Sequence, residues 1–333
     1  MKVILGLGMA AIVALSAAYA FSPRHTPALA ATRVPVDRMH FNTIARAGSN
    51  LVAGGELGHI VWSADEGRTW QAAAVEPTRY ALITQIVFED DKVGMAVGHE
   101  GQILRSDDGG KSWRELAFDE KNGEPLMSIA RLPSGSWLAV GAFGRALTSS
   151  DDGKTWVKAD LNGVEDKHLN RIVKARDGSR WLMLGERGLV LTSTDAGQSW
   201  SVIAPFYNGS LYGAVELPGG GWVAYGMRGN AFHAGADAQN WVKSRVPAPI
   251  SMLGHAIAAD GSLLLTGQGG IVLRSTDRGA SFTIVRGGER AALTDIAVLP
   301  DGSWVLASDG GMRLHDPRAA AAKAAAPASG AQK

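Results

Sequence analysis

An eight-residue pattern, Ser/Thr-x-Asp-x-Gly-x-Ser/Thr-Trp, returns along this chain. The copies are Ser63–Trp70, Ser106–Trp113, Ser149–Trp156, Ser193–Trp200, a degraded copy ending at Trp241 and a Phe-ended copy at Ser275–Phe282. The aromatic residues that end them lie 43, 43, 44, 41 and 41 residues apart. A period of about 40 residues, with strand-like residues and a Gly/Asp turn in every unit, indicates a β-propeller in which each unit is one blade.

Every unit follows the same order of strands and turns. An apolar stretch such as Leu126–Gly135 precedes a short strand such as Trp137–Gly141, a G-x-x-G turn follows, and a third strand leads into the pattern. The aromatic residue then opens a fourth strand. First strands begin near His40, Leu82, Leu126, Leu169, Leu211, Leu253 and Leu293. We therefore predict an all-β chain, a seven-bladed β-propeller of four-stranded antiparallel blades, over residues 31–316.

The seventh unit ends at Asp316 without the Asp pattern and without a fourth strand. The segment Ala31–Val36 precedes the first unit, and we predict that it donates the missing strand. Such an exchange would pair the sheet edges that an open ring leaves free.

Nine of the ten tryptophans fall into two periodic columns. Five end the pattern and four open the second strand of a unit: Trp70, Trp113, Trp156, Trp200 and Trp241, then Trp137, Trp181, Trp222 and Trp304. A large aromatic side chain at a fixed place in each repeat is typical of packing between blades.

The repeated aspartates are predicted to be structural. They are Asp65, Asp108, Asp151, Asp195 and Asp277. A turn carboxylate accepts backbone N–H bonds, and the glycine two residues later supplies a positive φ. Near-identical copies around a ring do not make equivalent active sites.

Composition and charge exclude several functions. The chain has 33 Lys and Arg against 32 Asp and Glu, which argues against a nucleic-acid partner bound by bulk charge. It has no cysteine, and its eight histidines form no H-x-H or H-E-x-x-H pair. We predict no metal site and no cofactor. The G-x-x-G turns join two strands and open no helix, so they are not phosphate loops.

The first 20 residues predict a signal peptide. They carry one lysine, a long apolar stretch and the small-residue site Ala18–Ala20, and a second such site at Ala28–Ala30 would allow cleavage as late as residue 30. We expect a periplasmic or secreted protein with no membrane span after cleavage; an uncleaved N-terminal anchor is the alternative. Residues 317–333 form an Ala-rich tail that we expect to be disordered.

The face made by the G-x-x-G turns and the links between blades is the predicted ligand face. Arg187 and Arg228 occupy the same turn position in adjacent units, and an acidic partner would dock there. The predicted partner-binding residues are Arg187, Arg228, Arg171, Lys167, Arg145 and Arg79. Scattered solvated charge is the alternative interpretation.

A second column of polar or small residues lies in the first strands. It comprises Thr43, Gln85, Ser128, Arg171, Gly213, His255 and Asp295. One strand register places them around the axial channel, where simple solvation is the favoured interpretation.

The repeats resemble the Asp-box, or BNR, repeats of sialidases, sortilin-type receptors and the photosystem II stability/assembly factor family. The stretches Ala96–Trp113 and Gly270–Gly279 are most similar to the assembly-factor group. That resemblance implies an exported, non-catalytic seven-bladed propeller that binds a protein partner, a subunit of a membrane complex, and assists its assembly. We expect a monomer.

A secreted glycoside hydrolase of sialidase type is the alternative function. Its chemistry requires three arginines around a substrate carboxylate, a Tyr nucleophile with a Glu partner, and an acid/base Asp. The residue types are present as Arg79, Arg187, Arg228, Arg290, Tyr80, Tyr207 and Glu100. The Arg-Ile-Pro motif of sialidases is missing, since Arg33–Pro35 reads Arg-Val-Pro, and short links leave little material for a deep pocket.

Overall fold

The computed structural model describes residues 2–22, 34–121, 123–164 and 166–319 of a chain that divides into two units, residues 1–33 and 34–333. The first unit contains helix α1 (Lys2–Phe21). Its segment Ile4–Phe21 is long and apolar enough to cross a membrane, and no other helix among the described residues is. Three predicted features, the cleavage site at 28–30, the start of the donated strand at 31–33 and the tail from 320, lie outside the described residues.

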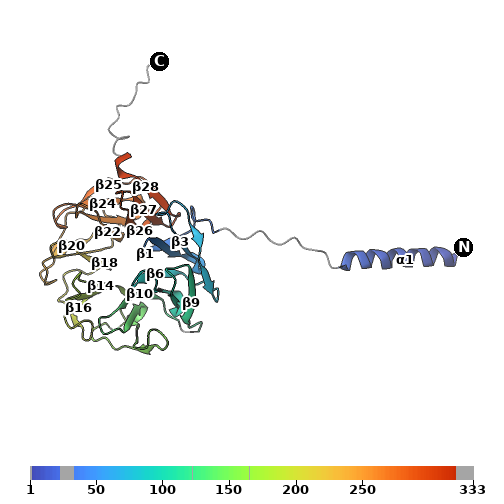
Figure 1. Cartoon of the computed structure of the whole chain (residues 1–333), viewed down its shortest axis with the longest axis horizontal. Helices are drawn as coiled ribbons and strands as arrows, with labels where there is room; N and C mark the ends of the chain where they lie inside the picture. The colour runs from blue at the N-terminus through green and yellow to red at the C-terminus, as the bar shows by residue number, and fades with distance from the viewer. Residues whose placement is uncertain (1, 23–33, 122, 165, 320–333) are drawn as a thin grey trace, which may run out of the picture. The chain divides into compact units, whose positions relative to one another are not determined.

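The second unit consists of seven sheets arranged around one axis (Figure 1). Blade 1 contains β1 (Phe41–Ala47), β2 (Asn50–Gly55), β3 (Ile60–Ser63) and β4 (Gln71–Ala72). Blade 2 contains β5 (Ala74–Glu76), β6 (Ile83–Phe88), β7 (Gly94–Gly98), β8 (Ile103–Ser106) and β9 (Ser112–Ala117). Blade 3 contains β10 (Leu126–Arg131), β11 (Trp137–Gly141), β12 (Ala146–Ser149) and β13 (Val157–Lys158). Blade 4 contains β14 (Leu169–Lys174), β15 (Trp181–Gly185), β16 (Val190–Ser193) and β17 (Ser201–Val202).

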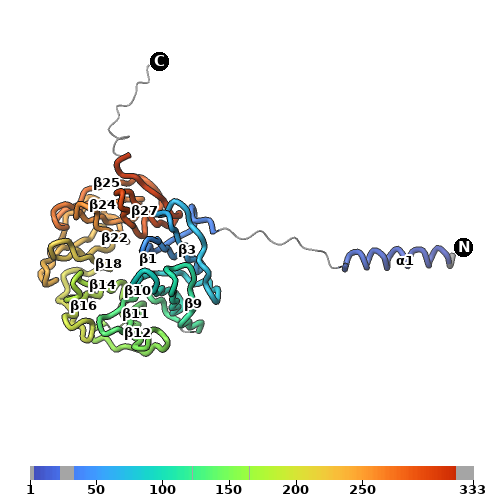
Figure 2. The backbone as a smooth tube through the Cα atoms, viewed as in Figure 1, coloured from blue at the N-terminus to red at the C-terminus, as the bar shows by residue number. Residues whose placement is uncertain are grey.

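The remaining blades follow in chain order around the ring (Figure 2). Blade 5 contains β18 (Leu211–Glu216), β19 (Trp222–Gly226), β20 (Ala231–Ala234) and β21 (Val242–Lys243). Blade 6 contains β22 (Met252–Ile257), β23 (Leu263–Gly267), β24 (Val272–Ser275) and β25 (Thr283–Arg286). Blade 7 contains β26 (Leu293–Val298), β27 (Trp304–Ser308) and β28 (Arg313–His315). The short 3-10 turns are η1 (Glu56–Gly58), η2 (His99–Gly101), η3 (Ala142–Gly144) and η4 (Gln268–Gly270).

The predicted seven-bladed, mainly antiparallel propeller is confirmed. Five of the seven sheets have four strands. Blade 2 has a fifth, because β5 pairs in parallel with the outer strand β9 after the chain leaves blade 1. The sequence analysis did not predict this extra strand.

The donated strand that we predicted for blade 7 is not formed by the described residues of that segment. Blade 7 has three strands, and Val34–Val36 are not in strand conformation. Pro35 has no N–H to donate to a strand ladder, and its carbonyl accepts the N–H groups of Arg38 and Met39, which turns the chain. The segment instead donates no strand but accepts a hydrogen bond from Met312 N at the Val36 carbonyl, at 2.7 Å, and packs Val34 and Val36 against the hydrophobic cluster shared by blades 1 and 7.

The hydrophobic core lies between the blades. Each of seven clusters combines buried side chains from two neighbouring blades. In the cluster between blades 3 and 4, Trp181 and Trp200 pack with Leu138. Both tryptophan columns therefore serve packing between blades, as predicted, because one large ring fills the gap between two twisted sheets.

The Asp-box turns are held by their own side chains. Asp195 accepts the hydroxyl of Ser193 at 2.8 Å and, from Ser199, the N–H at 2.9 Å and the hydroxyl at 2.5 Å. The Ser193 hydroxyl oxygen in turn accepts Gly197 N–H at 2.9 Å. The Ser199 bonds, followed by the Ser193 bond, lower the pKa of Asp195 to about 2, because they stabilise the carboxylate form.

Candidate functional site

The turn face is defined here as the face that carries the turns between second and third strands together with the links that enter each blade. The first glycine of each G-x-x-G turn lets a link approach the turn closely. At Gly226 a Cβ atom would lie 2.1 Å from the Ser210 carbonyl oxygen, and Met227 N–H donates to that oxygen at 3.1 Å. Only glycine permits this approach, so the motif fastens the links and fixes the shape of the turn face.

A residue with positive φ stands at the middle of these turns in five consecutive blades. These residues are Leu57, Glu100, Phe143, Arg187 and Arg228, with φ between 52° and 56°. Blade 6 has Gly269 there, with φ 72°. The left-handed conformation costs a side-chain-bearing residue roughly 1 kcal/mol. All five side chains are exposed, so the turns hold strained residues whose side chains are available to a partner.

Arg187 and Arg228 stand on either side of one link, as their spacing predicted. Gly188 N–H donates to the Gly209 carbonyl at 2.7 Å, and the charge of Arg228 acts on the Tyr207 phenol. Within the described residues neither guanidinium forms an ion pair. The two side chains thus present positive charge from adjacent blades to solvent.

Three other predicted basic residues, Arg79, Arg145 and Lys167, lie on the turn face, and each interacts with neighbouring groups. Arg79 forms two hydrogen bonds with Glu115, at 3.0 and 3.1 Å, and its guanidinium lies 4.3 Å from the Phe118 ring centre. Arg145 lies 4.0 Å from an Asp119 oxygen, with its side chain 18% exposed.

The third, Lys167, belongs to the link that enters blade 4. Its carbonyl accepts Gly144 N–H at 2.8 Å, which fixes its backbone beside η3. Beside it, the exposed ring of Phe143 packs against His168 at 4.7 Å. The turn face therefore offers an aromatic contact next to its cationic ones.

Arg171 does not belong to this surface. It lies in β14, the inner strand of blade 4, and its charge acts across the axial channel on Tyr225, His255 and Asp295. A patch that combines Arg171 with Arg187 is therefore not formed. Of the two positions predicted for Arg171, in the partner-binding set and in the column around the axial channel, its place in the inner strand agrees with the column.

The predicted column along the channel needs one correction, in blade 6. Gly254 pairs with Thr266 in the register in which Arg171 pairs with Leu184, so Gly254 is the blade 6 member of the column. His255 stands where the other blades have an aliphatic residue such as Ile172. The alignment slipped because blade 6 starts its first strand at Met252, one residue earlier than predicted.

Four column residues are not merely solvated. Their side chains accept the N–H of the aliphatic residue in the next blade; the bonds are Thr43 to Ile86 (3.4 Å), Gln85 to Ile129 (2.8 Å), Ser128 to Ile172 (3.0 Å) and Asp295 to Ile44 (2.8 Å). The inner strands have free edges toward the channel, and these bonds satisfy them. The favoured solvation interpretation is therefore wrong for these four residues.

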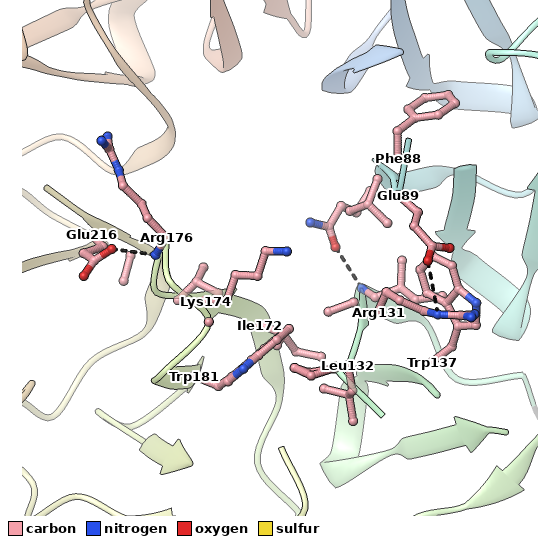
Figure 3. A pocket seen from close by; sticks show the side chains of 18 of the residues that line it. Phe88, Glu89, Arg131, Leu132, Trp137, Ile172, Lys174, Arg176, Trp181 and Glu216 are labelled. Atoms are coloured by element: carbon pink, nitrogen blue, oxygen red, sulfur yellow. Dashed lines mark hydrogen bonds and ion pairs between the residues drawn. The ribbon is translucent and has the colours of Figure 1, made fainter. Parts of the chain in front are cut away.

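A cavity of about 850 Å³ lies at the other end of the channel, between the turns that join first and second strands of blades 2 to 5 (Figure 3). Trp137 and Trp181 are among its walls, and Lys174 extends into it with its Nζ 5.9 Å from the Trp181 ring centre. Arg131 pairs there with Asp152 at 2.8 Å. None of the predicted partner-binding residues lines this cavity.

The ligand face predicted from the sequence is the opposite one, the turn face. The cavity was not predicted, because its lining residues come from five blades and share no motif. Among the described residues no group of three or more His, Asp or Glu side chains is placed to hold a metal ion.

A family model described as Photosynthesis system II assembly factor YCF48 matches residues 74–247. Among solved structures, "YCF48 bound to D1 peptide" is 18% identical, with 85% of this chain and 95% of that chain covered at a TM-score of 0.67. "YCF48 from Cyanidioschyzon merolae" is 17% identical, with 86% and 98% covered at 0.67. A streptogramin B lyase structure reaches 0.69 at 14% identity, with 85% and 95% covered. These likenesses show the fold. No curated protein matches the chain in sequence.

Proposed function

This chain belongs to the photosynthesis system II assembly factor YCF48 family, and from that premise we propose that it is an exported, non-catalytic scaffold that binds a subunit of a membrane complex through its turn face. The observation that carries the proposal is the pair of exposed guanidinium groups, Arg187 and Arg228, on adjacent blades. A fixed pair of arginines favours a partner segment that carries carboxylates, because each guanidinium can bind one in a bidentate manner.

The backbone supports this assignment. Both arginines occupy left-handed positions that glycine fills in blade 6, and a strained conformation on a rigid scaffold is typical of binding positions. The links beside them are fixed by the G-x-x-G turns, so the surface is ordered before a partner arrives. Preorganisation of this kind lowers the entropy cost of binding. Phe143 and Lys167 would extend the same contact toward blade 3.

A protein ligand agrees with what is known of a family member, since a YCF48 structure is described as bound to a D1 peptide. Export is proposed from the N-terminal helix α1, which ends beside the cleavage site Ala18–Ala20. N-terminal sequencing of the protein recovered from cells would show a start at residue 21 or 31 if the helix is removed.

A sialidase-type activity lacks the groups that it needs. A tyrosine nucleophile needs a lowered pKa, whereas burial raises the pKa of Tyr207. Arg79 is already paired with Glu115, and Tyr80 is 77% exposed in a link. Nothing in these positions favours hydrolysis over binding.

The experiment is affinity capture of the tagged protein after crosslinking in cells, with wild type beside the double variant Arg187→Glu/Arg228→Glu. Arg176→Glu is the matched control, because Arg176 is an exposed arginine of blade 4 at the end of the channel opposite the turn face. We expect a membrane-complex subunit with wild type and with Arg176→Glu, and at least a tenfold lower recovery with the double variant. Equal recovery from all three would exclude the turn-face arginines, and recovery of no membrane subunit from wild type would exclude the scaffold function.

A further inference from the structure

We propose that the axial channel contains a binding site for one carboxylate group, located between Arg171 of blade 4 and the backbone of Ala214 in blade 5. This site is distinct from the turn face and does not depend on the partner proposed above.

The ring of hydrogen bonds along the channel provides the template for the site. In four consecutive places a side-chain oxygen of one blade accepts an N–H of the next; the pairs are Asp295 with Ile44, Thr43 with Ile86, Gln85 with Ile129 and Ser128 with Ile172. The same strand position thus presents its N–H to the preceding blade each time. An acceptor at that place satisfies a donor that would otherwise face the channel unpaired.

The pattern stops at blade 4 because Arg171 occupies the acceptor position. A guanidinium has five donors and no acceptor. The following strand β18 has the same register shift, with Gly213 opposite Tyr225 and Ala214 opposite Ala224, so Ala214 N–H is presented toward Arg171. By this register Ala214 N–H is the donor equivalent to Ile172 N–H, and Arg171 offers it no acceptor.

The next two column residues are glycines, Gly213 and Gly254, and side chains of blades 5 and 6 fill the space over them. The Tyr225 ring lies over Gly213, since a Cβ there would be 2.4 Å from the Tyr225 hydroxyl, and that hydroxyl bonds to His255 Nδ1 at 2.7 Å. Thr266 lies over Gly254, with its hydroxyl 2.8 Å from where a Cβ would be. That hydroxyl is fully buried and, among the described residues, has no hydrogen-bond partner.

The charges near the site favour an anion. Arg171 forms no ion pair in the described part of the chain. The nearby Asp295 does not neutralise it by contact, because its two oxygens accept Ile44 N–H at 2.8 Å and Ile296 N–H at 2.9 Å. Arg171 is partly buried, so its charge has lost part of its hydration without gaining a contacting anion, and a ligand carboxylate would compensate for that loss.

A carboxylate fits better than a spherical anion. One of its oxygens can accept from Ala214 N–H, as Ser128 does for Ile172, while the guanidinium binds both oxygens in its planar fork. The route to the site is the 850 Å³ cavity, whose lining includes Ile172, Ala214 and His255. The ligand is thus a small carboxylic acid or the carboxylate end of a chain that enters the channel.

The test uses the full-length protein and two probes. The inert carboxylate 4-bromobenzoate is soaked into crystals of the wild type, and the bromine position is found by anomalous diffraction. Sodium acetate is titrated in a thermal unfolding assay against sodium chloride at equal ionic strength, with wild type, Arg171→Gln and the control Arg46→Gln, which changes an exposed arginine of β1. We expect bromine beside Arg171, and stabilisation by acetate that is at least tenfold weaker in Arg171→Gln and unchanged in Arg46→Gln.

Several outcomes would overturn the proposal. They are a soaked crystal without bromine in the channel, an equal acetate response in Arg171→Gln, and protection by chloride as strong as that by acetate. The wild-type soak decides the matter even if Arg171→Gln fails to fold. A carboxylate-ended peptide that competes with acetate would identify a chain end as the ligand, and a peptide that does not compete would identify a free small acid.

Discussion

The carboxylate of Asp295 accepts the backbone N–H of Ile44 at 2.8 Å, which joins blade 7 to blade 1 across 251 residues of sequence. The hydroxyl of Thr294 donates to the Phe41 carbonyl at 2.5 Å at the same seam. These bonds lie above a hydrophobic cluster shared by the two blades. The ring is therefore closed by side-chain bonds and packing.

Stability should depend on the ionisation of Asp295. Burial raises its pKa to about 6 from an ordinary value of 3.8, so its contribution to the free energy of unfolding is fully present below about pH 3.8 and is lost as the pH rises through 6. Asp295→Asn keeps one oxygen for Ile44 and cannot ionise. We expect the stability of this variant relative to wild type to rise by about 2–3 kcal/mol between pH 4 and 7.

The measurement is urea unfolding of both proteins across that pH range. His255 works in the opposite direction, because burial lowers its pKa to about 4 and its contribution is present above pH 6.5 and lost as the pH falls through 4. It is common to both proteins, so the difference between them isolates Asp295. Parallel pH profiles would contradict the prediction.

The buried Asp-box serine Ser193 should contribute to stability through its two hydrogen bonds. Ser193→Ala removes the acceptor of the buried Gly197 N–H as well as a donor to Asp195. An unsatisfied buried N–H costs about 1–3 kcal/mol, and we expect a loss of that size in chemical denaturation. Ser201→Ala, an exposed serine in β17, is the control and should change stability by less than about 0.5 kcal/mol.

The left-handed backbone conformation of Arg187 and Arg228 should lower the stability of the protein while it positions their side chains for binding. Arg187→Gly removes the left-handed strain at φ 54°, and we expect a gain of about 0.5–1 kcal/mol in thermal unfolding although glycine also loosens the unfolded chain. The same variant should recover less partner in the capture experiment. A destabilised variant would mean that Arg187 contributes to the fold, and the strain argument would fail.

In blade 4 a substitution could supply a hydrogen-bond acceptor for the indole N–H of Trp181. In blade 3 Trp137 Nε1 donates to Asp152 at 3.4 Å, whereas in blade 4 the Asp152 position is Ala196, and Trp181 Nε1 is buried without a partner among the described residues. Ala196 has φ 61°, which aspartate tolerates. We expect Ala196→Asp to stabilise the protein by about 0.5–1.5 kcal/mol in urea unfolding. An unchanged midpoint would show that the carboxylate stays in solvent.

The repeat was enough to predict the blades, the box turns and both tryptophan columns, because each is set by residues close in sequence. The prediction that Ala31–Val36 donates the fourth strand of blade 7 was wrong for the described residues, because Pro35 interrupts the strand ladder. The ring is closed instead by contacts between residues more than 250 positions apart in the sequence. The predicted strand register of blade 6 was also wrong. A one-residue shift at Met252 moves His255 into an aliphatic position, and no local signal marks it.

Residues close together in the chain are sufficient to specify seven similar sheets, because a turn with Asp and Gly and a strand opened by Trp are favoured by local sterics and hydrogen bonding. Which charges act together depends on the tertiary structure. Arg171 and Arg187 are sixteen residues apart in one blade, yet the inner strand directs one to the channel and the turn directs the other to the surface. Charge interactions depend on distance in space, which the spacing of residues along a chain does not fix.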